Sequence, residues 1–295
     1  MSRLLVAFAL SVALAIPSLG QDRNRHSLLP LKIRNVQYRP KGVLPLADRA
    51  ETTRLLRQNV NDPTGTTKIT NADDLRATAE NYAKALLEDH GFWRARIETK
   101  LVQIPAALSV RLVDVVFDID EGPQFHLSEI TWTGMKEFTQ DELQRAMPVH
   151  PGDVASRRQI ADGLDRLRKL YASRGYINFT SVPDTKIDAD ARAFALVIDV
   201  DEGVQFRFGD LTLPGLDEAP KQMVLQRWES IRGTVYSPEK EVAFFRSVMW
   251  PAYSSQLYRD SPYAFYQQFL HMQVDEKARV VNFSILFAPK PEDVH

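Results

Sequence analysis

Apolar and polar residues alternate along two stretches of the chain that closely resemble each other. Residues 113–135 read VDVVFDIDEGPQFHLSEITWTGM, and residues 195–216 read ALVIDVDEGVQFRFGDLTLPGL. Alternation at every second position is typical of a β-strand with one buried face. In both stretches this strand runs into Asp-Glu-Gly and then into a second apolar strand. A recurrence after about 81 residues predicts tandem domains of that size.

Glycines stand where these strands turn. Glycine adopts positive φ without steric cost, so Gly122 and Gly203 are predicted to let the chain leave one strand and enter the next. We expect a structural role, rather than ligand contact, for six glycines: Gly91, Gly122, Gly134, Gly175, Gly203 and Gly215.

Two helices are predicted between the strands of each repeat. In the first repeat, residues 48–60 have helical character, and Asn71 is the expected N-cap of a second helix. Apolar residues at helical spacing occupy equivalent places in the first two repeats. They are Leu75, Ala79, Tyr82 and Leu86, and then Ile160, Leu164, Leu167 and Tyr171. Each unit therefore runs strand, helix, helix, strand, strand.

The third repeat follows the same order less regularly. A strand over 208–213 and a helix over 218–231 precede Ser237, the expected N-cap of a helix whose first residue is Pro238. That helix is expected to bury Val242, Phe245 and Met249 and to be stopped by Trp250-Pro251. Residues 263–274 and 279–287 then form a predicted hairpin.

The Asp-Glu-Gly junction between repeats resembles the junction between tandem POTRA domains, the polypeptide-transport-associated modules of outer-membrane barrel assembly factors. A second motif agrees, because His90-Gly91-Phe92 and Arg174-Gly175-Tyr176 are similar to the family's "GY" step from the second helix into the middle strand. The resemblance covers roughly residues 29–289 and is weaker in the third repeat. It implies an α+β fold of three β-α-α-β-β domains, each a small mixed sheet covered by two helices, over 27–124, 125–205 and 206–290.

The first twenty residues differ from the rest. Arg3 precedes an apolar run over 4–16, and Pro17 and a small-residue site over 18–20 follow, as in a secretory signal peptide. A retained membrane anchor, the alternative, needs roughly 18 or more apolar residues. We therefore expect cleavage, no membrane span afterwards, and a periplasmic protein associated with the outer membrane through a partner. The chain has no cysteine, so packing alone must hold it together.

Composition and motifs argue against several classes of function. The 37 basic and 38 acidic residues lack the basic excess of a nucleic-acid surface. No histidine has the short partner spacing of a metal site. The acidic run Asp118, Asp120, Glu121 and its copy Asp199, Asp201, Glu202 are interpreted as the outward face and turn of a strand. We expect no catalytic site, no metal and no cofactor, and no barrel after the three domains.

The middle strand of each repeat is the candidate binding site, since the resemblance places it at the sheet edge. An edge strand offers unpaired backbone groups to an extended polypeptide. The predicted strand over 93–101 carries Arg94 and Arg96, charges that also protect edges. The strand over 176–182 is uncharged and is the preferred candidate, through Tyr176, Ile177, Asn178, Phe179 and Thr180.

The leading hypothesis is a POTRA-repeat protein that binds client or partner polypeptides in outer-membrane protein assembly. Its partners would be unfolded outer-membrane proteins or a barrel-bearing assembly protein. One alternative is a cell-envelope scaffold in a division or secretion complex with a fixed folded partner. A less favoured alternative is an envelope hydrolase on an unfamiliar fold.

Overall fold

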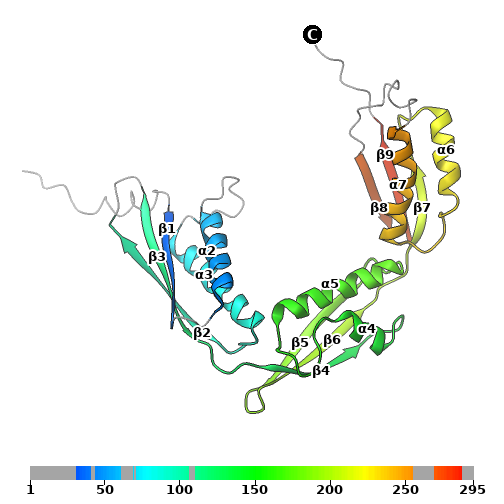
Figure 1. The fold of residues 1–295 in the computed structure, drawn as a ribbon. Coiled ribbons are helices and arrows are strands. Elements are labelled where there is room, and N and C mark those ends of the chain that lie inside the picture. Colours follow the sequence, from blue (N-terminus) through cyan, green and yellow to red (C-terminus); the bar gives the residue numbers. More distant parts are fainter. Residues whose placement is uncertain are drawn as a thin grey trace, which may run out of the picture. The chain divides into compact units, whose positions relative to one another are not determined.

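The computed structural model describes residues 31–40, 44–60, 69, 71–105, 110–254 and 269–287. The predicted signal peptide lies outside these residues. Within them the chain forms three repeats of strand, helix, helix, strand, strand, which we call domains 1, 2 and 3 (Figure 1). The predicted α+β class and element order are confirmed.

Domain 1 has a three-stranded sheet in the order β1-β3-β2. Strand β1 is parallel to β3, and β2 is antiparallel to it. Asn71 caps the second helix as expected, because its side-chain oxygen accepts a 2.8 Å hydrogen bond from the backbone N–H of Asp74. The elements are β1 (Leu31–Arg39), α2 (Leu46–Val60), α3 (Ala72–Asp89), β2 (Arg96–Ile104) and β3 (Arg111–Asp120).

Domain 2 repeats this arrangement with the order β4-β6-β5. A capping box starts its first helix, since Thr139 and Glu142 each accept a hydrogen bond from the other's backbone N–H. The second helix packs Ile160, Leu167 and Tyr171 onto the sheet. The elements are β4 (His126–Thr133), α4 (Gln140–Ala146), α5 (Arg157–Ser173), β5 (Thr180–Asp188) and β6 (Ala193–Asp201).

Domain 3 has the order β7-β9-β8. Its core is aromatic, with the buried Trp228 edge-on to both Phe208 and Phe283. The predicted cap is present, because the Ser237 hydroxyl accepts from the backbone N–H of Lys240 at 3.3 Å. The elements are β7 (Arg207–Thr212), α6 (Glu218–Trp228), α7 (Pro238–Ser254), β8 (Phe269–Asp275) and β9 (Val280–Leu286).

Helix α7 differs from the prediction in two ways. It continues through Pro251 to Ser254, so the Trp250-Pro251 pair does not end it. Proline removes one backbone donor, and this loss falls near the helix end, where few further bonds depend on it. The helix buries Phe244 and Val248, whereas Val242 is exposed. The side chain of Met249 lies outside the described part.

The chain divides into two compact units. The first contains the residues up to Leu87 together with Arg94–Gly122, and the second contains Glu88–Trp93 and everything from Pro123 onward. The end of α3 and the turn after it therefore belong, by their contacts, with domains 2 and 3. Among the described helices, none is long and apolar enough to cross a membrane.

Candidate functional site

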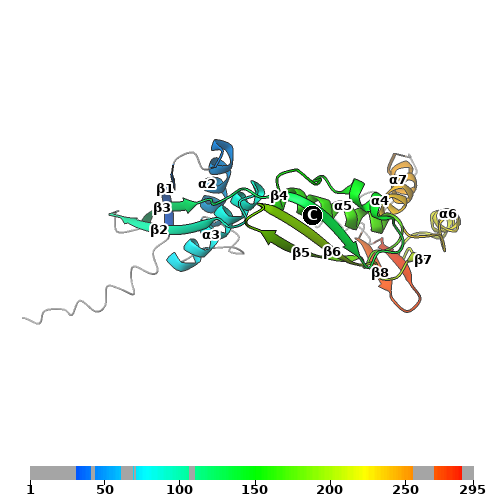
Figure 2. The same cartoon turned by 90° about the horizontal axis from the view of Figure 1, so that it is seen from below.

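The middle strands β2, β5 and β8 each lie at the edge of a described sheet, as expected. Figure 2 shows β5 on the outer side of β6. Within the described residues, each pairs along one side only, with β3, β6 and β9 respectively. In this part of the chain no strand pairs with the other side, and such an edge is the arrangement to which an extended segment adds.

Charged side chains protect the edge of domain 1. Lys100 on β2 contacts Asp118 at 2.7 Å and Glu98 at 3.2 Å. These contacts raise the pKa of Lys100, chiefly through the hydrogen bond to Asp118. An incoming strand would have to disturb this cluster, so β2 is a poor acceptor.

The edge of domain 2 is protected by proline and charge. Pro183 lies in the middle of β5, opposite Ile198, and supplies no backbone donor. The exposed Asp184 and Lys186 follow it. The predicted bounds of this strand, 176–182, are wrong, because it begins at Thr180 and contains the charged residues that follow Val182. Binding at this edge stays a prediction.

The edge of domain 3 has neither protection. Strand β8 carries no charge and no proline from Phe269 to Val274. Leu270 and Met272 are 46% and 48% exposed. They pair across the sheet with the buried Ile285 and Phe283, so they lie on the core-facing side of the sheet. Among the three described middle strands, only β8 has a run of six residues without charge or proline.

Four of the five candidate residues in domain 2 lie outside the strand. Residues 176–179 form the turn before β5, and only Thr180 belongs to it. Phe179 is buried and stacks on Tyr171 with 4.2 Å between ring centroids. Ile177 packs against the core of domain 3. The alternating polarity of this segment comes from docking contacts and not from a strand.

Strand β2 of domain 1 likewise begins later than predicted, at Arg96 instead of residue 93. Arg94 precedes the strand and Arg96 is its first residue. Trp93, also predicted to be in the strand, instead belongs to the second unit. Its indole N–H donates to the carbonyl of Ala155 at 2.6 Å, and its ring lies 4.5 Å from that of Phe194.

The "GY" step is a docking turn that occurs twice. Gly91 and Gly175 have φ of 81° and 84°, and each carbonyl accepts a 2.9 Å hydrogen bond from a phenylalanine N–H, Phe125 or Phe206. Beside each, a glutamine side chain donates to the residue before the glycine, Gln124 to His90 and Gln205 to Arg174. The repeated Gln-Phe after each Asp-Glu-Gly was the sequence signal for this contact.

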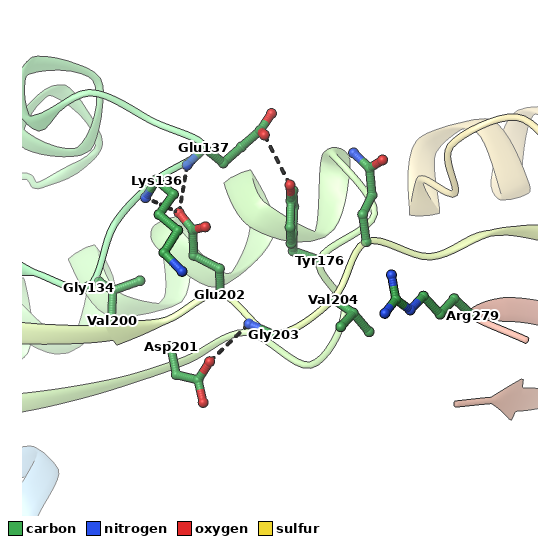
Figure 3. A pocket seen from close by; sticks show the side chains of 11 residues that line it. Gly134, Lys136, Glu137, Tyr176, Val200, Asp201, Glu202, Gly203, Val204 and Arg279 are labelled. Atoms are coloured by element: carbon green, nitrogen blue, oxygen red, sulfur yellow. Dashed lines mark hydrogen bonds between the residues drawn. The ribbon is translucent and has the colours of Figure 1, made fainter. Parts of the chain in front are cut away.

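Glu202 is buried, contrary to its interpretation as part of an outward turn. The residue is 8% exposed, and one carboxylate oxygen accepts from the backbone N–H groups of Lys136 and Glu137 at 2.7 and 2.8 Å (Figure 3). The same oxygen accepts from the Tyr171 hydroxyl at 3.1 Å. Burial, followed by this hydrogen bond, raises the pKa of Tyr171 well above its ordinary value.

A cavity of about 600 Å³ lies beside Glu202 (Figure 3). Residues from both sides of the linker contribute to it, including Lys136 and Tyr176 from domain 2 and Arg279 from domain 3. Its charged groups are of both signs, which favours no one class of small ligand. In the described part of the chain no three His, Cys, Asp or Glu side chains gather as a metal site would require.

Comparison with known proteins agrees with the fold and with these turns. Residues 125–203 match the POTRA family model, described as a surface antigen variable number repeat. Residues 125–203 are a POTRA domain. The match ends at Gly203, the last residue of the Asp-Glu-Gly junction. Domains 1 and 3 have the same element order and sheet topology as this POTRA domain.

Two curated relatives match parts of the chain. The outer membrane protein assembly factor BamA of Neisseria meningitidis is 24% identical over 152 residues, which cover 48% of this chain and 19% of that protein. A putative outer membrane protein assembly factor of Treponema pallidum is 30% identical over 113 residues, covering 35% and 14%. The matches thus span less than a fifth of either relative.

A solved structure shares the fold over most of the chain. The crystal structure of POTRA domains 3–5 of Haemophilus influenzae BamA superposes with a TM-score of 0.52 and is 15% identical, covering 88% of this chain and 96% of that one. This likeness supports the assignment of three POTRA-like domains.

Proposed function

We propose that this chain is a periplasmic POTRA-repeat protein that binds client or partner polypeptides during outer-membrane protein assembly, by adding an extended segment to a free sheet edge. Its relatives' names support the setting, since both are assembly factors of the outer membrane. Binding rather than catalysis fits a domain whose repeated architecture places a strand at the sheet edge. The partners would be unfolded outer-membrane proteins or a barrel-bearing assembly protein.

The uncharged edge of β8 is the observation that supports this proposal. An added strand would gain several backbone hydrogen bonds, each contributing about 0.5–1.5 kcal/mol net. Ordering the incoming segment offsets much of this gain. The affinity should therefore be weak, on the order of micromolar to millimolar. Weak binding suits a protein that must release what it has bound.

The two faces of β8 favour a particular kind of segment. Leu270 and Met272 lie on the core-facing side, whereas His271 and Gln273 alternate with them and point to the opposite face. A partner strand whose residues alternate apolar and polar would match both faces at once. Transmembrane β-strands have this alternation. Unfolded outer-membrane proteins are therefore the preferred class of client.

Site-specific photo-cross-linking in the bacterial envelope tests the proposal. A photoreactive residue replaces His271 on β8, Val182 on β5 or Val102 on β2, all of which are exposed. We expect a broad set of outer-membrane barrel proteins captured mainly from position 271. A single stoichiometric partner would favour the scaffold in a division or secretion complex. Equal capture from all three positions would exclude β8 as the site, and no envelope partner at all would overturn the proposed function.

A further inference from the structure

Glu202 lies at the start of the linker between domains 2 and 3. Strand β6 ends at Asp201 and β7 begins at Arg207, so residues 202–206 connect the two domains. The carboxylate points back into domain 2, where it receives the three hydrogen bonds described above. Two of the donors, Lys136 and Glu137, belong to the loop that leaves β4.

The same loop is tied to the other side of the linker. One Glu137 carboxylate oxygen accepts from the Tyr176 hydroxyl at 3.0 Å, and the other from Arg174 at 3.3 Å. These residues flank Gly175, whose carbonyl accepts from the Phe206 N–H. The beginning of the linker is thus connected to residues 136–137 through Glu202, and its end is connected to them through the turn at Gly175. Figure 3 shows the Glu202 and Tyr176 contacts.

The turn itself does not require a buried glutamate. Asp201 already closes it by accepting from the Gly203 N–H at 3.0 Å, as Asp120 does for Gly122 at 3.3 Å in domain 1. A buried carboxylate is stabilising only when donors surround it, because its desolvation is otherwise costly. Glu202 has three donors, all from domain 2, and lies one residue before the turn glycine Gly203, whose φ is 68°. Because its carboxylate is held by domain 2, Glu202 can restrain the first residues of the linker.

We propose that Glu202 is a positioning residue that fixes how domain 3, and with it the β8 edge, is attached to domain 2. Two further contacts help to hold domain 3 in place. The Asn178 amide donates to Glu276 of the β8–β9 turn at 2.9 Å, and Val204 packs into the core of domain 3. Without the Glu202 carboxylate, the first part of the linker loses its attachment while the Gly175 contact remains. This inference does not depend on what β8 binds.

Double electron–electron resonance on the full chain tests the role of Glu202. The chain has no cysteine, so spin labels can be placed at Arg166→Cys on α5 and Gln226→Cys on α6, both exposed positions. In Glu202→Ala and Glu202→Gln we expect a broader distance distribution than in the parent. Hydrogen exchange of the Lys136 and Glu137 amides should accelerate by about tenfold, equivalent to ~1.4 kcal/mol.

Asp199→Asn is the matched control, because the Asp199 carboxylate lies near the end of β6, three residues before Glu202, and accepts a hydrogen bond from the Thr133 hydroxyl within domain 2. It should change neither the distances nor the exchange at 136 and 137. If the alanine variant does not fold, Glu202→Gln, which keeps the side chain's size, decides the outcome. Faster exchange or a lower melting temperature with an unchanged distance distribution would overturn the proposal, because Glu202 would then stabilise domain 2 without positioning domain 3.

Discussion

The carbonyl oxygen of Gly175 accepts a 2.9 Å hydrogen bond from the backbone N–H of Phe206, the residue immediately before strand β7. A Cβ atom on Gly175 would lie 2.7 Å from the Phe206 carbonyl oxygen, and its φ of 84° is unfavourable for any other residue. Gly175→Ala should therefore lower the free energy of unfolding by more than the roughly 1–2 kcal/mol expected from left-handed backbone alone. Urea unfolding measures the loss.

Gly152→Ala is the control for this substitution. Gly152 has a φ of 97°, but a Cβ atom there would meet nothing within 4 Å. This variant should lose only the conformational contribution. If both variants lost the same free energy of unfolding, the contact between the added Cβ atom and the Phe206 carbonyl oxygen would not be a cause of the destabilisation.

A charge on the β8 edge should weaken capture of an extended peptide. Met272→Lys places a cation where an incoming apolar side chain would pack, and we expect affinity for an alternating apolar and polar peptide to fall by roughly tenfold, ~1.4 kcal/mol. Met223→Lys is the matched control, because Met223 is also exposed but lies on α6. Fluorescence anisotropy of a labelled peptide reports both. Equal effects would place the binding site elsewhere.

Acid should weaken domain 1 through Asp114. The Arg34 guanidinium donates to the Asp114 carboxylate, with Nε to Oδ1 at 2.8 Å, and this hydrogen bond holds the pKa of Asp114 below its usual range. The folded-state pKa is lower than the unfolded one, so the contribution is fully present above the unfolded value of about 3.9. It is lost as the pH falls through the folded-state pKa.

Asp114→Asn should accordingly flatten the loss of stability below about pH 4. Hydrogen exchange of β3 amides between neutral and acidic pH follows domain 1 specifically. In an Arg34→Met background, the same asparagine substitution should leave the acid slope nearly unchanged. A full effect in that background would mean that the Arg34 contact is not the cause.

Loss of the Ser237 cap should destabilise domain 3. Its hydroxyl oxygen is the acceptor for the Lys240 N–H at the start of α7, and the side chain is buried. Ser237→Ala should cost about 1 kcal/mol, typical of a lost N-cap. Ser247→Ala lies within the same helix, where alanine is the best helix former, and should be close to neutral. Thermal unfolding of both variants tests this; similar melting temperatures would argue against a capping role.

The order of strands and helices could be predicted from the sequence because each element carries its own periodicity. Alternation along Arg111–Asp120 and Ala193–Asp201, helical spacing along Arg157–Ser173, and the Ser237-Pro238 start signal are local properties. The turn at Gly203, whose φ is 68°, is likewise required by the chain around it. The edge position of the middle strands followed from the resemblance to tandem POTRA domains.

The contacts of the turn before β5 could not be predicted in this way. Tyr176 and Ile177 alternate in polarity like a strand, but Tyr176 donates to Glu137 and Ile177 packs on domain 3. The burial of Glu202 has the same cause, since two of its three donors come from a loop more than sixty residues earlier and the third is Tyr171 on α5. Local patterns do not record which distant groups a side chain will meet, and for this reason the edge strand of domain 2 was predicted to begin at Tyr176 instead of Thr180.

The central place of the last strand in each sheet determines the order in which the domains can be completed. Strand β4 pairs with β6, while β5, which is synthesised between them, adds to the outer side of β6. As the chain grows from its N-terminus, β4 and β5 have no sheet to join until β6 has emerged, so folding of domain 2 must wait for a contact distant in sequence. The Gly175 carbonyl then receives its donor only when Phe206 follows. In the same way the Gly91 carbonyl receives its donor only when Phe125 follows, so the first residues of domains 2 and 3 are each hydrogen-bonded to a turn that was synthesised earlier.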